Sequence, residues 1–124
     1  YDYPEVVREK GLNLLCTPGN DVESTTALAG SGAHLILFST GLGTPTGNPI
    51  IPVIKISSTN VLKRRMSDII DFSSGDIITG EKGLDELAEE LLALCVDACS
   101  GSYQSKSQVL GQDDFLPWKR GISL

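Results

Sequence analysis

Four short apolar runs, separated by turn and helix signals, constrain the fold of this chain more than any other feature of its sequence. They occupy residues 12–17, 35–38, 52–56 and 69–72. Each has the length of a strand, and continuous apolar runs are typical of strands buried on both faces of a parallel sheet. Because helix-like segments lie between several of them, the sequence predicts an α/β fold, specifically a three-layer Rossmann-like domain with a mostly parallel sheet.

Two helices are predicted among these runs. The first covers residues 22–30, with Asp21 as the expected N-cap and Gly32 just beyond the end of the helix. The second covers residues 60–67, is short and polar, and carries three consecutive basic residues at positions 63–65.

The clearest helix covers residues 84–99, where apolar side chains recur at i, i+3, i+4 and i+7. Gly83 is its expected N-cap and Gly101 its expected stop. Residues 76–80, before this helix, are predicted to form a turn. Beyond it the chain is polar as far as residues 115–118, whose aromatic side chains are expected to dock on the domain or on a neighbour.

The composition is that of an ordinary acidic domain. Of the 124 residues, 40% are hydrophobic and 21% are charged, and the net charge is −6 at pH 7. The charge argues against nucleic acid and anionic membranes as partners, because both attract basic surfaces. No apolar run approaches the roughly 18 residues of a membrane span, and no secretory signal is visible, so a cytoplasmic location is expected.

The chain opens at Tyr1, and its only methionine is Met66. We therefore expect residues 1–124 to be a single domain of a longer protein. Within it, residues 1–11 are predicted to be a lead-in and residues 102–124 a docking tail.

Three cysteines, Cys16, Cys95 and Cys99, show no disulfide framework, and their odd number fits a reducing compartment. Cys95 and Cys99 are four residues apart on the predicted helix, a spacing that would let both contact one metal ion. We favour the alternative that all three are small buried apolar residues. His34, the only histidine, is also predicted to be structural.

Three segments rich in small polar groups follow predicted strands, at residues 19–26, 40–47 and 57–60. Ligands of parallel sheets bind beyond the carboxyl ends of the strands, and helix N-termini and glycine loops present N–H groups to anions. The sequence Gly41-Leu42-Gly43 lacks the third glycine of a dinucleotide fingerprint and the Gly-Lys-Ser/Thr of a P-loop. The loop is therefore either an anion-binding loop or a structured surface loop.

Two charged residues interrupt the apolar runs. Lys55 lies between Ile54 and Ile56, so it is either on a solvated face or a partly buried amine that clamps an anion or acts as a base. Asp71, after two isoleucines, would cap the next turn or act at a site. The chain contains no Ser-His-Asp order, His-Glu-x-x-His motif or Cys-x-x-Cys pair, so no catalytic set is evident.

A set of motifs runs through most of the chain. In order they are Thr17-Pro18-Gly19, Asp21, Ser24, Thr26, Gly32-Ala33, Leu35, Thr40-Gly41, Gly43-Thr44-Pro45, Gly47, Lys55, Asp71, Gly75, Gly80-Glu81, Ser100-Gly101, Lys106-Ser107 and Phe115-Leu116-Pro117-Trp118. Together they resemble the C-terminal region of the altronate/galactarate dehydratase family of bacterial sugar-acid hydro-lyases. The chain differs from that family at Leu42, where arginine is usual, and at Ser73, where asparagine is usual.

The resemblance implies an enzyme that removes water from a sugar acid, most closely an altronate dehydratase that gives 2-keto-3-deoxy-gluconate. The alternatives are a galactarate dehydratase, a sulfolactate-type lyase subunit, or a non-catalytic anion-binding or assembly module. The resemblance also implies a divalent metal, iron(II), held mainly by upstream domains of the same chain. Those domains would be the partners of this one, and a homo-oligomer is compatible with the resemblance.

The resemblance also implies roles for particular residues. Lys55 and Asp71 would be the catalytic acid/base or positioning groups, and no metal ligand is assigned to this chain. The residues implied to bind substrate are Ser24, Thr26, Thr40, Gly41, Gly43, Thr44 and Gly47.

Overall fold

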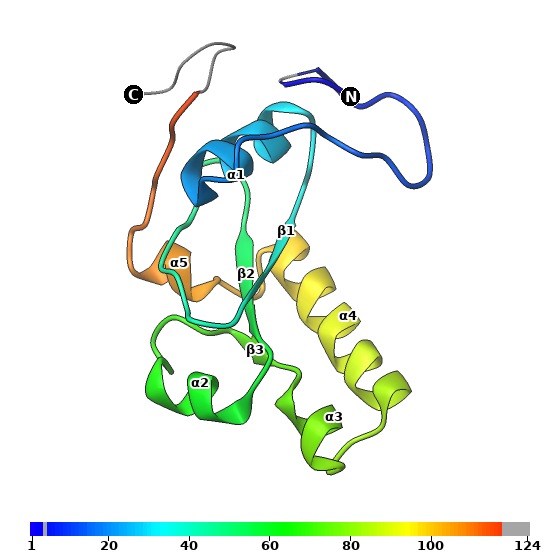
Figure 1. Ribbon diagram of the computed structural model, residues 1–124, viewed down its shortest axis with the longest axis vertical. Coiled ribbons are helices and arrows are strands. Elements are labelled where there is room, and N and C mark those ends of the chain that lie inside the picture. The colour runs from blue at the N-terminus through cyan, green and yellow to red at the C-terminus, as the bar shows by residue number, and fades with distance from the viewer. Residues whose placement is uncertain (4, 118–124) are drawn as a thin grey trace.

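A computed structural model describes residues 1–3 and 5–117 and shows three parallel strands with helices around them (Figure 1). The strands β1 (Ile36–Thr40), β2 (Val53–Ser57) and β3 (Phe72–Ser73) form one sheet in the order β1-β2-β3. The predicted α/β class with a parallel sheet is therefore confirmed.

The central strand is β2, and its sequence explains its position. Its consecutive residues Val53 and Ile54 are both fully buried, so both faces of the strand are covered. Val53 packs with Ile36 and Ile51 in the hydrophobic core. In the registers of the two ladders, Thr40 lies opposite Ser57 and Ser57 lies opposite Ser73. Hydroxyl side chains therefore stand on all three strands at the carboxyl edge of the sheet.

The helices occupy both ends and the sides of the sheet. Helix α1 (Asp21–Gly30) lies at the amino-terminal end of β1 and β2, whereas α2 (Asn60–Arg65) and α3 (Gly75–Thr79) lie at the carboxyl end (Figure 1). The long helix α4 (Leu84–Ser100) runs alongside, and the short helix α5 (Lys106–Val109) contacts β2.

The helix ends follow the capping rules with one correction. The N-cap of α1 is Asn20, not Asp21, because the Asn20 side chain accepts hydrogen bonds from two backbone N–H groups of the first turn. Gly32 has a φ of +102°, which suits its predicted place beyond that helix. For α4, the predicted N-cap Gly83 and the left-handed C-cap Gly101 are both confirmed.

The strand predicted over residues 12–17 does not form. Leu12 is 94% exposed and Leu14 is 77% exposed, so the segment is not part of the core. Its backbone bonds to the start of the chain instead, since the Tyr1 nitrogen donates to Leu14 O and Cys16 N–H donates to Tyr1 O. The prediction failed because an apolar run becomes a parallel strand only where a sheet edge accepts it.

Two elements near β3 differ from those that the sequence predicted. Residues 69–72 were predicted to be a strand, but Ile69 and Ile70 lie in the turn after α2, where both N–H groups donate to Met66 O. The strand in this region is therefore limited to the two residues of β3, Phe72 and Ser73. Residues 76–80 were predicted to be a turn, but residues 76–79 belong to α3 and Gly80 is its left-handed C-cap.

The cysteines were predicted to be buried, and this was wrong. Cys16 and Cys99 are exposed and Cys95 is half-buried. The periodicity of α4 is real, but only Leu87 and Ala98 on that helix are fully buried, because the small sheet covers a narrow part of its apolar surface.

In the tail, Leu116 N–H donates to Thr26 Oγ1 on α1 at 3.1 Å, whereas Trp118 lies outside the described residues. The docking-tail boundaries stay a prediction. Among the described residues, no helix has the length and apolar character needed to cross a membrane.

Candidate functional site

Lys55 is a buried amine in the middle of β2. Its side chain has no solvent exposure, its Nζ donates to the carbonyl of Thr46, and the Phe38 ring centre lies 5.5 Å away. The solvated-face alternative is therefore wrong, because the amine is buried. Its predicted role as an anion clamp or base stays a prediction. The ammonium group holds the loop after β1 against the central strand.

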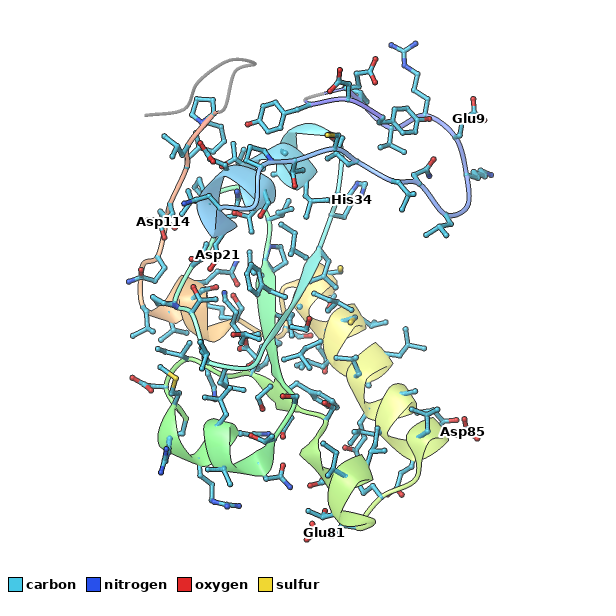
Figure 2. The ribbon with its side chains drawn as sticks, in the orientation of Figure 1. Glu9, Asp21, His34, Glu81, Asp85 and Asp114 are labelled. Atoms are coloured by element: carbon cyan, nitrogen blue, oxygen red, sulfur yellow. The ribbon has the colours of Figure 1, made fainter. Side chains whose placement is uncertain are left out.

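Burial lowers the pKa of Lys55 to about 8, although three carboxylates oppose the shift. Asp71 is one of them, and the others are Asp21 at the start of α1 and Asp114 in the C-terminal segment. Figure 2 shows Asp21 and Asp114 on the same side of the molecule. Desolvation outweighs these attractions because the amine has no direct carboxylate partner among the described residues.

Asp71 is the centre of a buried hydrogen-bond knot. Its Oδ2 accepts the backbone N–H of Lys55 at 2.7 Å. Its Oδ1 accepts the Tyr103 hydroxyl at 2.7 Å and the backbone N–H of Lys106 at 2.9 Å. The carboxylate is 9% exposed, so these three donors take the place of water. Asp71 thereby ties β2 to the segment that leads into α5.

Tyr103 was missed by the sequence analysis. Burial, followed by its bond to Asp71, raises the pKa of this phenol above its usual range, so it remains a donor at neutral pH. No local pattern marks a tyrosine that lies 32 residues from its partner in the sequence.

At the carboxyl edge of the sheet lies a cavity of about 200 Å³, named here the hydroxyl hollow. It is lined by Ser39, Thr40, Gly41, Ile56, Ser58 and Ser74. A second cavity of about 380 Å³ shares Gly41 with it and is lined also by Leu42, Thr59, Val61, Leu62, Arg65 and Met66. This second cavity is named here the arginine hollow. The two lie where ligands of parallel sheets bind.

A polar network supports this edge from below. Ser73 Oγ donates to Asn60 Oδ1 at 2.7 Å, and Asn60 Nδ2 donates to Asp76 Oδ1 at 2.6 Å. Gly75 packs so closely that an added Cβ would lie 2.5 Å from Asn60 N. The network joins α2 to α3 and to Ser73, beside the residues that line the two hollows.

The loop after β1 leaves the carboxyl edge and returns along the sheet to the start of β2 (Figure 1). Gly43, at a φ of +91°, donates its N–H to Thr40 Oγ1 at 2.9 Å and so stays near the hydroxyl hollow. Thr44 instead bonds Thr46, hydroxyl to hydroxyl, at 2.9 Å. The structure thus brings Thr40, Gly41 and Gly43 together, with Thr44 directed elsewhere.

Ser24 and Thr26 lie on α1, at the opposite end of the sheet from Thr40 (Figure 1). Ser24 Oγ donates to Asp21 O, and Thr26 Oγ1 accepts the N–H of Leu116. The structure therefore does not bring these two residues to the hydroxyl hollow. The sequence placed them there because it assumed a strand before α1, which would have put that helix start at the carboxyl edge.

Gly47 lies against the C-terminal segment. A Cβ on this residue would lie 2.0 Å from the carbonyl oxygen of Gln112, and 3.1 Å from Cβ of Ser107. The glycine is therefore required by a close backbone approach, whatever its role in binding.

Replacing Gly47 by alanine is expected to destabilise the chain by about 1–3 kcal/mol, because the loop and the Gln112 backbone must separate. Urea unfolding followed by circular dichroism measures the loss. Gly41→Ala is the matched control in the same loop, since no heavy atom lies within 4 Å of its Cβ. Equal stability of the two variants would contradict the close approach.

Residues 1–3 and 5–117 contain no group of three or more His, Cys, Asp or Glu side chains that could hold a metal ion. Cys95 and Cys99 line an apolar hollow of about 420 Å³ with Val96 and Ser100, which offers them no carboxylate or imidazole co-ligand. The residues described do not fit a metal centre, so no metal-dependent step is assigned to them.

A parallel α/β domain with cavities at its carboxyl edge is a common framework for enzymes that act on small polar substrates. The sequence matches the family described as D-galactarate/Altronate dehydratase, C-terminal, over residues 1–123. The chain belongs to this family.

Three curated relatives show how the match is distributed. The chain is 43% identical to altronate dehydratase of Escherichia coli K12 over 98% of its own length and 24% of the relative. It is 34% identical to galactarate dehydratase (L-threo-forming) of the same organism, over 83% of the chain and 20% of the relative. It is 30% identical to (2R)-sulfolactate sulfo-lyase subunit beta of Chromohalobacter salexigens, over 93% of the chain and 29% of the relative. The chain thus spans about a quarter of the length of these relatives.

Proposed function

We propose that this chain is the C-terminal region of a sugar-acid dehydratase that converts altronate to 2-keto-3-deoxy-gluconate in the cytoplasm. The observation that carries this proposal is the 43% identity to an altronate dehydratase over nearly the whole chain. Identity to galactarate dehydratase is lower and covers less of the chain, which makes galactarate the second candidate substrate.

The proposed reaction removes the proton on the carbon next to the carboxylate and expels the neighbouring hydroxyl as water. The resulting enol then takes a proton at the third carbon and becomes the 2-keto acid. A divalent metal, iron(II), would stabilise the enediolate. Because the described residues do not fit a metal centre, we assign that ion to the rest of the longer protein.

We assign substrate contacts to the hydroxyl hollow. The side chains of Ser39, Thr40, Ser58 and Ser74 can donate to and accept from the hydroxyls of a polyol. Of the residues predicted to bind substrate, Thr40 and Gly41 line this hollow, and Gly43 is bonded to Thr40 beside it.

We assign positioning roles to Lys55 and Asp71. Lys55 Nζ is buried against the Thr46 carbonyl, so it acts on the glycine loop and not on a ligand. Asp71 is occupied by three donors and acts through the backbone of β2. Lys55 fixes the loop after β1 through Thr46, and Asp71 fixes β2, whose Ile56 lines the hollow.

Full-length protein supplied with ferrous iron should form a 2-keto-3-deoxy acid from altronate, and more slowly or not at all from galactarate. A colorimetric assay for the product measures this across a panel of sugar acids. The isolated 124-residue chain should be folded but inactive, because the metal ligands lie elsewhere. Absence of product from every hexonate would contradict the proposal and favour a binding or assembly module.

A further inference from the structure

The basic residues of α2 are unusual in so acidic a chain. Lys63, Arg64 and Arg65 follow one another in a protein of net charge −6. Within residues 1–3 and 5–117 there is a single ion pair, Lys82 with Glu90, so no described carboxylate neutralises these three side chains. Unpaired guanidinium groups beside a cavity are available for an external anion.

Arg65 is the charged residue that lines the arginine hollow, beside Gly41, Thr59 and four apolar side chains. Arg64 lines a different cavity with Glu81, whose negative charge opposes anion binding there. Glu81 lies beyond α3 at the outer end of the molecule (Figure 2). Of the two arginines, Arg65 is therefore the one placed to bind an anion next to the glycine loop.

The arginine hollow and the hydroxyl hollow meet at Gly41, which lines both. The pair therefore has hydroxyl side chains on one side and Arg65, among apolar side chains, on the other. A polyhydroxy acid has the same division, with a hydroxylated body and one carboxylate end. The volumes, about 200 and 380 Å³, lie in the range of sites for small ligands when combined.

We propose that Arg65 binds the carboxylate of the substrate and thereby selects sugar acids over neutral sugars and polyols. The guanidinium group can hold both carboxylate oxygens at once, which fixes the direction in which the chain of hydroxyls enters the hydroxyl hollow. This inference rests on the proposed function, since it names the anchoring contact of the same site.

The test uses the full-length dehydratase with altronate. Arg65→Ala should raise KM by about 10- to 100-fold, the value of a charge-assisted hydrogen-bond pair, with a smaller change in kcat. Arg65→Lys should recover part of the loss, because a lysine keeps the charge but not the bidentate geometry. Arg64→Ala is the matched control, since it removes the same charge from the same helix and should leave KM within about twofold.

A second measurement distinguishes a loss of carboxylate binding from a general loss of folded protein in the Arg65→Ala variant. Altritol, the polyol that lacks the carboxylate, should inhibit the wild type and Arg65→Ala equally, because it makes no use of the guanidinium group. If the wild type is active but Arg65→Ala keeps its KM, or if Arg64→Ala raises KM equally, the assignment of Arg65 is overturned and the proposed function stands. If the wild type converts no sugar acid, both fall.

Discussion

Asp71→Ala is expected to lower the free energy of unfolding of the 124-residue chain by about 3–5 kcal/mol, which is much of the stability of a domain of this size. The substitution leaves three donors without an acceptor, namely the N–H groups of Lys55 and Lys106 and the hydroxyl of Tyr103. These donors lie on segments that are far apart in the sequence, so their loss weakens the attachment of α5 to the sheet, which then depends on bonds such as that from Ser107 Oγ to Val53 O.

Urea unfolding at pH 7, followed by circular dichroism, measures this loss. Asp68→Ala is the matched control, because Asp68 is an exposed aspartate three residues earlier that makes no side-chain hydrogen bond to the described residues. Asp71→Asn should fall between the two, since an amide keeps one acceptor oxygen. A loss for Asp71→Ala within 1 kcal/mol of the Asp68→Ala value, on the order of one ordinary hydrogen bond, would show that the knot does not stabilise the fold.

Lys55→Met is expected to change how stability depends on pH. In the folded wild type the pKa of Lys55 is lowered to about 8 from 10.5, so between these values the unfolded chain binds more protons than the folded chain. The contribution of Lys55 to the stability of the wild type therefore rises with pH across this window, and below pH 8 the full cost of burying the charge remains. A shift of this size corresponds to about 3 kcal/mol between pH 8 and pH 10.5.

The difference in unfolding free energy between wild type and Lys55→Met isolates this residue. The pKa of Tyr103 is raised in the folded state, so this residue contributes stability below pH 10 that is lost as the pH rises further. The contribution is the same in both proteins and therefore cancels in their difference. Relative to Lys55→Met, the wild type should gain stability from pH 8 upward and should show a constant difference between pH 6 and pH 7.5. A difference that stays constant up to pH 10.5 would mean that Lys55 is hydrated in the folded protein.

The elements that the sequence predicted well are those whose signals are local. The apolar run of β2 is buried on both faces, and α4 starts and stops at the glycines that mark its ends. Capping and burial of a central strand depend on neighbouring residues, so a single sequence contains the information.

The elements that it predicted poorly depend on partners distant in the chain. Residues 12–17 have the composition of a strand, but their backbone bonds to Tyr1 and not to β1. That misplaced strand is also why Ser24 and Thr26 were expected beside Thr40. Which apolar run joins a sheet is decided by the competition among all edges and segments, and periodicity does not report it.

The residues of the candidate site likewise divide into those that the local sequence marks and those that only the fold reveals. The glycine loop and Lys55 stand out in the sequence, because small polar residues after a strand and a charge inside an apolar run are visible locally. Tyr103 does not stand out, and Arg65 is visible only as one of three consecutive basic residues, since the role of each depends on the place to which the fold brings it. Tyr103 meets Asp71 from 32 residues away, and Arg65 meets Gly41 across a cavity.

The most direct test of the account is to analyse the product that the full-length protein forms from altronate in D₂O with ferrous iron. Dehydration through an enol removes the hydrogen on the second carbon and places one solvent-derived hydrogen on the third. The account predicts 2-keto-3-deoxy-gluconate with a single deuterium on the third carbon, detected by NMR and mass spectrometry. Unchanged altronate at the end of the incubation would contradict the assignment of this family member as a sugar-acid dehydratase.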